Sequence, residues 1–223
     1  MVSVDTLRLL IKSIVELLWP ARCVACRQGS GFACPACLAQ IAPAWRRPPV
    51  FEHLDRFVAC SALSETTEAF VYALKYRGLQ DLATPLADRM CDVLALRQTT
   101  RALFGTNPLI IPVPLHPTRL RQRSYNQADL LARRIASVAA MPMDATSLAR
   151  TRATDQQVKQ ADRGARRENM KGAFAVIDTA TVTGRDIVLI DDVSTTGATL
   201  DDCARALKAS GARTVSAIVL AHG

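Results

Sequence analysis

The segment VLIDDVSTTGATL, residues 188–200, places two carboxylates directly beside hydroxyl side chains and a glycine. Val188, Leu189 and Ile190 predict a strand that is buried on both faces, and the pattern from Gly197 onward predicts a helix. Main-chain N–H groups at such a strand-to-helix turn converge near the positive end of the helix, and this arrangement binds phosphate. The N–H groups expected to converge belong to Thr195, Thr196, Gly197, Ala198 and Thr199.

The neighbouring pair, Asp191 and Asp192, does not suit a site for phosphate alone. A carboxylate about 6 Å from a phosphate is repelled by roughly 3 kcal/mol at an effective dielectric constant of about 20. We therefore expect a ligand with two different faces, only one of which is anionic. An acid pair at a strand end without the threonine-rich loop would more simply indicate a generic metal or helix-capping site.

Seven cysteines occur in the chain, and four of them form two Cys-x2-Cys pairs separated by seven residues. Each pair can direct two thiolates at one tetrahedral centre, which suits structural zinc. The loop between the pairs is shorter than usual, so an apo or lost site is the alternative. The proposed ligands are Cys23, Cys26, Cys34 and Cys37, whereas Cys60, Cys91 and Cys203 lie in apolar segments and are expected to be plain buried cysteines.

The composition is that of a globular protein: 223 residues, of which 49% are hydrophobic and 22% charged. No apolar run reaches the roughly 20 residues of a membrane span, and no segment resembles a signal peptide, so we expect a protein in the reducing cytoplasm. The net charge is +8, and the segment from Arg119 to Lys171 contains twelve Lys or Arg residues but only five acidic residues. This concentration indicates a polyanionic ligand, although surplus charge can also serve solubility alone.

Four units are expected along the chain: an amphipathic helix over 1–20, a cysteine module over 21–44, a proline-rich linker over 45–54 and a main domain over 55–223. In the main domain, strands that alternate with helices predict a mainly parallel sheet covered on both faces, with ligands at the C-terminal edge. Strands are expected over 56–63, 107–114, 172–178, 186–193 and 213–222, and helices over 64–78, 79–97, 126–140 and 197–212.

The acid pair and its loop resemble the ribose-phosphate-binding motif of type I phosphoribosyltransferases. The four cysteines, LKYRG, IPVPLHPTRLRQRSYNQA, LARTRATDQQ, RRENMKGAF and this loop occur in the order of the ComF family of competence and GntX-like proteins. This resemblance covers nearly the whole chain. It implies a type I phosphoribosyltransferase-like α/β fold with a small N-terminal four-cysteine module similar to a zinc ribbon.

The ligand that the resemblance implies is 5-phosphoribosyl 1-pyrophosphate with Mg²⁺. Asp191 and Asp192 would then hold the ribose hydroxyls, which are donors that suit carboxylates, and Ser194 to Thr199 would hold the 5-phosphate. The pyrophosphate is expected at the turn after Pro112, through the backbone from Val113 and Pro114 to His116. Prolines in a loop are also common for purely structural reasons, and His116 could be a solvated loop residue.

Basic residues follow this turn, and the family shows Arg-Gly-Phe-Asn-Gln where this chain has Arg123-Ser124-Tyr125-Asn126-Gln127. The missing glycine puts any conformation that requires it in doubt. Asn126 and Gln127 could simply cap a helix. Lys75 in LKYRG matches a family lysine that could reach pyrophosphate, or it could stabilise the end of its helix. Arg119, Arg121 and Arg123 all follow the turn after Pro112, and Arg123 is expected to take part in binding 5-phosphoribosyl 1-pyrophosphate.

The polar segment from Arg150 to Lys171 corresponds to the mobile loop that closes over the substrate in phosphoribosyltransferases. Closure would exclude water and bring arginines to the departing pyrophosphate, a role expected for Arg163 and Arg167. A solvated charged loop is the alternative. The residues that match the family pattern are Arg150, Arg152, Gln157, Arg163, Arg167 and Asn169.

Two functions are compatible with these features. The first is a magnesium-dependent phosphoribosyltransferase connected to natural competence and DNA uptake, although no acceptor site is identifiable. The second is a non-catalytic accessory that binds single-stranded DNA through the zinc module and the basic segment, and that uses the phosphoribosyl site to sense a nucleotide-like ligand. Either protein would work with the competence machinery.

Overall fold

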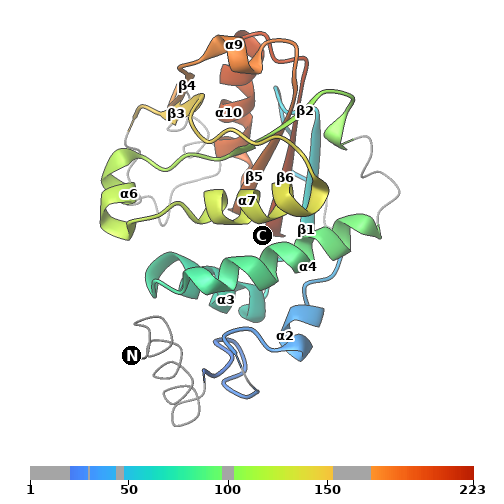
Figure 1. The fold of residues 1–223 in the computed structure, drawn as a ribbon, viewed down its shortest axis with the longest axis vertical. Helices are drawn as coiled ribbons and strands as arrows, with labels where there is room; N and C mark the ends of the chain where they lie inside the picture. Colours follow the sequence, from blue (N-terminus) through green and yellow to red (C-terminus); the bar gives the residue numbers. More distant parts are fainter. Residues whose placement is uncertain (1–20, 30, 44–47, 97–102, 153–171) are drawn as a thin grey trace, which may run out of the picture.

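The computed structural model describes residues 21–29, 31–43, 48–96, 103–152 and 172–223, and the helix expected over residues 1–20 lies outside these ranges (Figure 1). A parallel sheet surrounded by helices forms the centre of the molecule. The predicted mainly parallel α/β fold is confirmed. Within these ranges, every helix falls short of the length and hydrophobicity that a membrane crossing needs.

The main sheet has the strand order β1-β6-β5-β2 in the described part of the chain, and all neighbouring strands run parallel. Ile190 of β5 is paired with Ile218 of β6 and with Pro112 of β2, so the C-terminal ends of these strands lie at one edge. Continuous burial from Asp186 to Ile190 explains the apolar run of β5, because strands of a parallel sheet are covered on both faces. The strands are β1 (Arg56–Ala62), β2 (Pro108–Pro112), β5 (Asp186–Ser194) and β6 (Thr214–His222).

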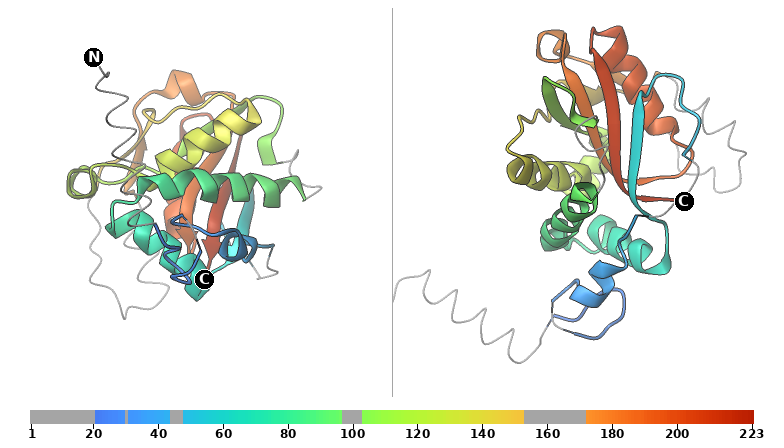
Figure 2. Two further views of the ribbon diagram at one scale, coloured as in Figure 1. Left: turned by 60° about the horizontal axis from the view of Figure 1, so that its bottom comes forward. Right: turned by 90° about the vertical axis from the view of Figure 1, so that its right-hand side faces the viewer.

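Helices cover both faces of this sheet (Figure 2): α4 (Ala83–Ala95) and α7 (Gln127–Ala139) lie on one face and α10 (Ala198–Ala209) on the other. The predicted start of α3 (Glu65–Tyr76) is confirmed, because the Ser64 side chain accepts a hydrogen bond from the backbone N–H of Thr67. The shorter helices are α2 (Pro35–Ala39), α6 (Pro117–Arg123) and α9 (Thr179–Val182), and the 3-10 helix η1 (Gln80–Leu82) precedes α4.

Side chains of β5 alternate between two apolar cores, one on each face of the sheet. Val188 and Ile190 belong to the core under α4 and α7, whereas Ile187 and Leu189 belong to the core under α10. Successive residues of a strand point to opposite faces. The same alternation carries Asp192 to the face of α4 and α7, and Asp191 to the face of α10.

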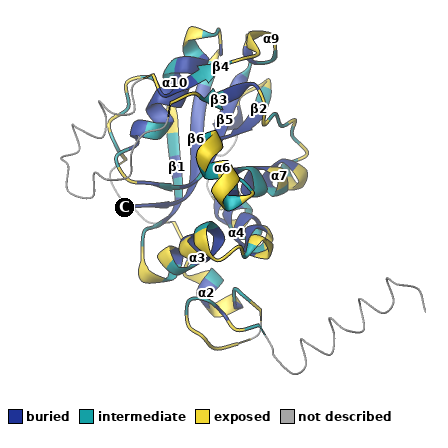
Figure 3. Ribbon diagram, turned by 90° about the vertical axis from the view of Figure 1, so that its left-hand side faces the viewer, coloured by how far each residue is buried: buried dark blue, intermediate teal, exposed yellow. Residues whose placement is uncertain are grey.

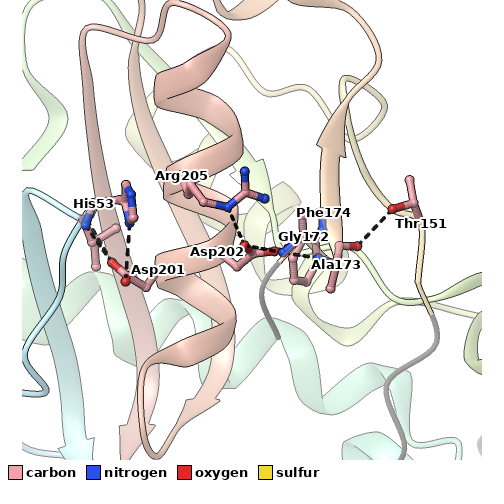
Figure 4. Close-up of polar contacts among 9 residues, drawn as sticks. His53, Thr151, Gly172, Ala173, Phe174, Asp201, Asp202 and Arg205 are labelled. Atoms are coloured by element: carbon pink, nitrogen blue, oxygen red, sulfur yellow. Dashed lines mark hydrogen bonds and ion pairs between the residues drawn. The ribbon is translucent and has the colours of Figure 1, made fainter. Parts of the chain in front are cut away.

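The segment expected as a strand over 172–178 lies outside the main sheet. Its central part, β4 (Phe174–Val176), pairs antiparallel with β3 (Leu148–Arg150), which the sequence analysis did not predict as a strand. Asp202 of α10 explains this placement, because its carboxylate accepts hydrogen bonds from the backbone N–H groups of Gly172, Ala173 and Phe174 at 2.9, 2.8 and 3.2 Å (Figure 4). The three amides hold the start of β4 beside α10.

The cysteine module shares an apolar core with the main domain. Cys23, Cys34, Cys37 and Ile41 lie in the same cluster of buried residues as Met90 of α4. The Arg89 Nε atom donates a hydrogen bond to the backbone oxygen of Ile41 at 2.9 Å, which fixes the end of the module to α4. The module is therefore packed against the body of the protein, below α3 and α4 in Figure 1.

The described part of the expected linker, residues 48–54, is held against the N-terminal turn of α10. The backbone N–H groups of Glu52, His53 and Leu54 donate to the same Asp201 oxygen at 3.0, 2.8 and 3.3 Å. Figure 4 shows His53 beside Asp201. Leu54 is buried in the core under α10. This segment connects the cysteine module to β1 and also contacts the loop that follows β5.

Candidate functional site

The predicted ribose, phosphate and pyrophosphate loops come together at the C-terminal ends of β5 and β2. The N–H of Val113, the first residue after β2, donates to the Ile190 oxygen at 2.9 Å. The Asn126 side chain donates to the Val113 oxygen at 3.0 Å and accepts from the N–H of Ala128 at 3.1 Å. Asn126 therefore caps α7, as predicted, and also holds the turn after β2, which the sequence did not indicate.

Asp192 is a buried carboxylate with only one of its oxygens engaged. Its Oδ1 atom lies 2.9 Å from the Lys75 Nζ atom and accepts a hydrogen bond from the N–H of Val193 at 2.7 Å. Its Oδ2 atom is buried without a hydrogen-bond partner in the part of the chain that the structure describes. An unsatisfied buried carboxylate oxygen is costly, so this atom requires a donor or a cation that a ligand can supply.

Asp191 lies on the opposite face of β5 and accepts a hydrogen bond from the N–H of Asp192 at 2.8 Å. Burial, together with the adjacent charge of Asp192, raises the pKa of Asp191 to about 8. The two acids thus differ in their environment: Asp192 is paired with a lysine, whereas Asp191 holds its proton at neutral pH until a cation or a ligand favours the charged form.

Lys75 in the last turn of α3 is the counterion of Asp192. Burial lowers the pKa of Lys75, but the charges of Asp192 and Asp191 outweigh burial and leave the pKa raised. The lysine is therefore protonated. The structure brings it to the acid expected to hold ribose, and its contact with pyrophosphate stays a prediction.

The loop after β5 has the features of an anion site at the start of a helix. Gly197, the N-cap of α10, has a φ of 76°, in the left-handed region that glycine favours. A Cβ atom at this position would lie 2.5 Å from Phe51 Cε1 and 3.1 Å from Pro49 Cβ, so the docked segment 48–54 also requires glycine. Ser194 is buried, and its Oγ atom has no partner among the described residues.

A basic pocket of 330 Å³ lies next to this site, between the end of α3 and α6. The proposed ribose and 5-phosphate residues do not line it, but Lys75 lines it and also contacts Asp192. Arg119, Arg123 and Lys75 are cations that the sequence singles out, whereas Tyr76 and Tyr125, which could equally have been core residues, line the pocket. The full set is Lys75, Tyr76, Gly78, Arg119, Gln122, Arg123 and Tyr125.

The turn between α6 and α7 keeps a left-handed conformation without the glycine of the family pattern. Ser124, in the place of that glycine, has a φ of 67°. The conformation that the substitution put in doubt is therefore retained, with the strain that a side chain brings to this region. Arg123 next to it donates to the Gln127 side chain, and its guanidinium lies 5.2 Å from the centre of the Tyr76 ring.

Part of the predicted arginine set can be located. Arg150 of β3 lies with its guanidinium 5.4 Å from the centre of the Phe174 ring. Burial, followed by the charge of Arg119, lowers the pKa of Arg150, so two of the expected cations are electrostatic neighbours. The predicted residues Gln157, Arg163, Arg167 and Asn169 lie outside the described residues.

The four N-terminal cysteines form the cluster that their spacing predicts. All four Sγ atoms lie within 4.8 Å of one another, and those of Cys26 and Cys34 are 3.7 Å apart. Tetrahedral zinc with bonds of about 2.3 Å would place sulfurs about 3.8 Å apart, so the cluster fits this metal. Gly29 has a φ of 72°, and a Cβ atom there would lie 3.0 Å from Cys34 Cβ, which explains a glycine in the short loop.

The other three cysteines are not part of this cluster. Cys60 and Cys203 are fully buried, as predicted, but Cys91 is only partly buried, so the prediction for Cys91 was wrong. Its position on the side of α4 near Asp88 and Arg134 explains the exposure. Burial, followed by the charge of Asp191, raises the pKa of Cys203 well above its usual value, so this thiol is unreactive.

Comparisons with known proteins agree with this arrangement. The model of the phosphoribosyl transferase domain family matches residues 123–223. The chain is 33% identical to DNA utilization protein YhgH of Escherichia coli O157:H7 over 76% of this chain and 72% of that protein. It is 30% identical to Competence protein F of Haemophilus influenzae over 85% of this chain and 78% of that protein.

Among solved structures, the chain is similar to glutamine phosphoribosylpyrophosphate amidotransferase from B. subtilis. The TM-score is 0.40 and the sequence identity 15%, over 62% of this chain and 26% of that longer chain. The similarity to the two bacterial proteins, which extends over most of their length, establishes the relationship. The chain therefore belongs to the ComF family of phosphoribosyltransferase-like proteins.

Proposed function

We propose that this protein binds 5-phosphoribosyl 1-pyrophosphate with Mg²⁺ at the C-terminal ends of β5 and β2. The observation that carries the proposal is the acid pair: Asp192 is buried with an Oδ2 atom that no described residue hydrogen-bonds, and burial raises the pKa of Asp191 beside it to about 8. Two such carboxylates at a strand end are unfavourable without a ligand. Ribose hydroxyls donate hydrogen bonds, so they suit these oxygens.

The remaining groups at this edge fit the two phosphoryl ends of that molecule. The loop from Ser194 to Thr199 leads into α10, whose N-terminal dipole and N–H groups favour a monophosphate. The turn from Val113 to His116 offers backbone amides for the pyrophosphate, with Arg119 close to it along the chain. Magnesium would neutralise the pyrophosphate charge and lower repulsion from the acid pair.

The test is calorimetric titration of the protein with 5-phosphoribosyl 1-pyrophosphate, with and without Mg²⁺. We expect Asp191→Asn and Asp192→Asn to weaken binding at least tenfold. Asp178→Asn is the matched control, because Asp178 caps the exposed helix α9 and an asparagine keeps the cap. Unchanged affinity in both site variants, with folding intact, would refute the assignment.

The raised pKa of Asp191 adds a second readout to the same titration. If the ligand requires the charged carboxylate, binding below pH 8 must release a proton, and the wild-type affinity should rise between pH 6 and pH 8. The rise should disappear in Asp191→Asn. An affinity that does not depend on pH in the wild type would argue against contact between Asp191 and the ligand.

The names of the relatives support a cellular role in DNA uptake and utilisation. Whether the site transfers the phosphoribosyl group is tested by pyrophosphate release in the presence of purines, pyrimidines or single-stranded DNA. Release that depends on one acceptor indicates a phosphoribosyltransferase. Binding without release indicates the alternative, a non-catalytic DNA-handling accessory with a ligand-sensing site.

We also infer that the cysteine cluster binds structural zinc. The four thiols fit tetrahedral coordination, and three of them are buried in the core that contains α3 and α4. Elemental analysis should give one zinc per chain, and Cys37→Ser should lower both the zinc content and the unfolding temperature. Cys91→Ser, on the outer part of α4, should change neither. Full zinc content in Cys37→Ser would contradict the assignment.

A further inference from the structure

The pocket between α3 and α6 has a charge that its own surroundings do not balance. Three of its lining residues are cations, Lys75, Arg119 and Arg123, and no acid lines it. Lys75 is paired with Asp192 and Arg123 is bonded to Gln127, whereas Arg119 makes no hydrogen bond or ion pair with any described residue. Convergent cations in a concave surface favour an anionic group such as phosphate.

An exposed aromatic surface adjoins these cations. Tyr72 and Tyr76, one turn apart on α3, are 59% and 57% exposed, and their rings lie 5.2 Å apart. The Tyr72 and Tyr76 rings are tilted by 45°, and the guanidinium of Arg123 lies 5.2 Å from the centre of the Tyr76 ring, so the tyrosines and this arginine form one contiguous surface. Such surfaces bind planar rings by stacking, and nucleobases stack on them without regard to sequence.

The pocket is also accessible. No residue of α6 is buried, and most of the helix is exposed (Figure 3), and it projects from the left side of the molecule in Figure 1. The volume of 330 Å³ is at the lower end of the range for small-molecule sites, which suits a single unit of ligand. A ligand that carries both a planar ring and a phosphate would satisfy both parts of this surface.

We propose that the pocket between α3 and α6 binds a nucleotide unit, with its phosphate at Arg119 and Arg123 and its base stacked on Tyr76. The same chemistry is offered by a free nucleotide and by one residue of a single strand. The pocket shares Lys75 and Arg119 with the side expected to hold pyrophosphate, but none of the residues from Asp191 to Thr199 lines it, so this inference goes beyond the proposed ribose-phosphate site.

The experiment uses the full chain and two probes: adenosine 5′-monophosphate followed by calorimetry, and a fluorescein-labelled oligothymidylate of about ten nucleotides followed by anisotropy. We expect Tyr76→Ala and Arg119→Gln each to weaken binding at least fivefold, in line with the contribution of one stacked base. Tyr76→Phe, which keeps the ring, should retain the affinity. Arg121→Gln is the matched control, because Arg121 is exposed on the same helix outside the pocket lining.

The two probes identify the source of the nucleotide. Binding of the monophosphate supports a free nucleotide, and binding of the oligonucleotide alone supports a single strand. If neither probe binds, or if Tyr76→Ala and Arg119→Gln bind both probes as tightly as the wild type, the proposal is overturned. Asp191→Asn should bind the oligonucleotide normally, and Tyr76→Ala should bind 5-phosphoribosyl 1-pyrophosphate normally, so failure of one site is distinguishable from failure of the other. The titration with the monophosphate is carried out with 5-phosphoribosyl 1-pyrophosphate and Mg²⁺ in excess, because the monophosphate also carries a ribose 5-phosphate that suits the first site.

Discussion

The two ends of β5 each carry a buried aspartate, and the carboxylate oxygens of these two residues differ in how many hydrogen-bond donors they have. Asp186 at the beginning is 2% exposed and Asp192 near the end is 1% exposed. Asp186 accepts hydrogen bonds from Arg213, from the Thr214 hydroxyl at 2.8 Å, and from the N–H groups of Thr106 and Asn107 at 2.8 and 3.0 Å. The Arg213 guanidinium, followed by these other donors, holds the pKa of Asp186 well below its usual range, although burial opposes this.

Asp192 has a much poorer set of partners. Lys75 and the N–H of Val193 both use Oδ1, and Oδ2 has no partner in the described part of the protein. A carboxylate with all its acceptor positions occupied stabilises the fold, whereas a buried carboxylate with an unused oxygen stores unfavourable energy that a ligand can relieve. The comparison assigns the start of β5 to stability and its end to binding.

The largest effect should come from removing the satisfied acid. Asp186→Ala leaves Arg213, Thr214 and the N–H groups of Thr106 and Asn107 without their acceptor, and we expect a loss of about 3 kcal/mol in the free energy of unfolding. Urea denaturation followed by circular dichroism measures this loss. Binding of 5-phosphoribosyl 1-pyrophosphate should persist while the variant is folded. A loss below about 1 kcal/mol would contradict the assignment of the start of β5 to stability and of its end to binding.

A double-mutant cycle at the other end should give a smaller effect. Lys75→Met leaves Asp192 buried without its counterion, and we expect a loss of about 2 kcal/mol at pH 8. Lys75→Met combined with Asp192→Asn should return to within about 1 kcal/mol of the wild type, because position 192 then no longer carries a buried charge without a counterion. If the double variant is as unstable as Lys75→Met alone, the loss in Lys75→Met does not come from the unpaired charge of Asp192.

The two ends also predict opposite dependences of stability on pH. The pKa of Asp191 is raised to about 8 in the folded state, so its contribution is present below its unfolded pKa of about 4 and is lost as pH rises toward 8. The slope should reach at most about 1.4 kcal/mol per pH unit, and Asp191→Asn should flatten it. Asp186 has a lowered pKa, so its stabilisation is lost only when pH falls below about 4.

Urea unfolding of the wild type and Asp191→Asn at half-unit intervals from pH 3 to pH 9 measures both slopes. The wild-type stability should pass through a maximum in the acidic range, between the two titrations. If the two proteins show the same slope between pH 5 and pH 8, the raised pKa of Asp191 is not what controls stability there.

The smallest expected effect concerns backbone strain. Near Asp186 a positive φ is adopted by a glycine, Gly105, whereas near the binding end one is adopted by a residue with a side chain, Ser124. Ser124→Gly should relieve the left-handed strain and raise the free energy of unfolding by about 0.5 to 1 kcal/mol. Ala140→Gly, at the left-handed end of α7, is the matched control and should give a similar gain without changing ligand affinity. If Ser124→Gly lowers the free energy of unfolding, contacts of the serine side chain contribute more to stability than relief of the backbone strain does.

Most of the fold could be predicted because its signals are local. Apolar runs located β1, β2, β5 and β6, and Ser64 and Asn126 marked helix starts that the structure confirms. The pairing of β3 with β4 could not be predicted, because three residues give little periodicity and Asp202 holds the segment from a helix far along the chain. In sequence, Asp201 and Asp202 look like ordinary acids of a first helical turn.

The residues of the candidate site could be predicted more fully than the contacts between them. The acid pair, the glycine loop and the four cysteines have characteristic spacing. The contact between Lys75 and Asp192 joins residues of two distant segments, and only the packing of α3 against the end of β5 creates it. The exposed tyrosines of α3 gave no signal, because an aromatic residue on a helix is as easily read as part of the core.

The anchoring of Glu52, His53 and Leu54 on a single Asp201 oxygen limits how this protein can change in length. Insertions are ordinarily tolerated in proline-rich connections because their backbone is unattached. Here one added or deleted residue would displace the chain by about 3.5 Å, enough to lose all three hydrogen bonds. Natural length variation between the cysteine module and β1 should therefore accumulate before residue 48 and avoid the stretch that follows it.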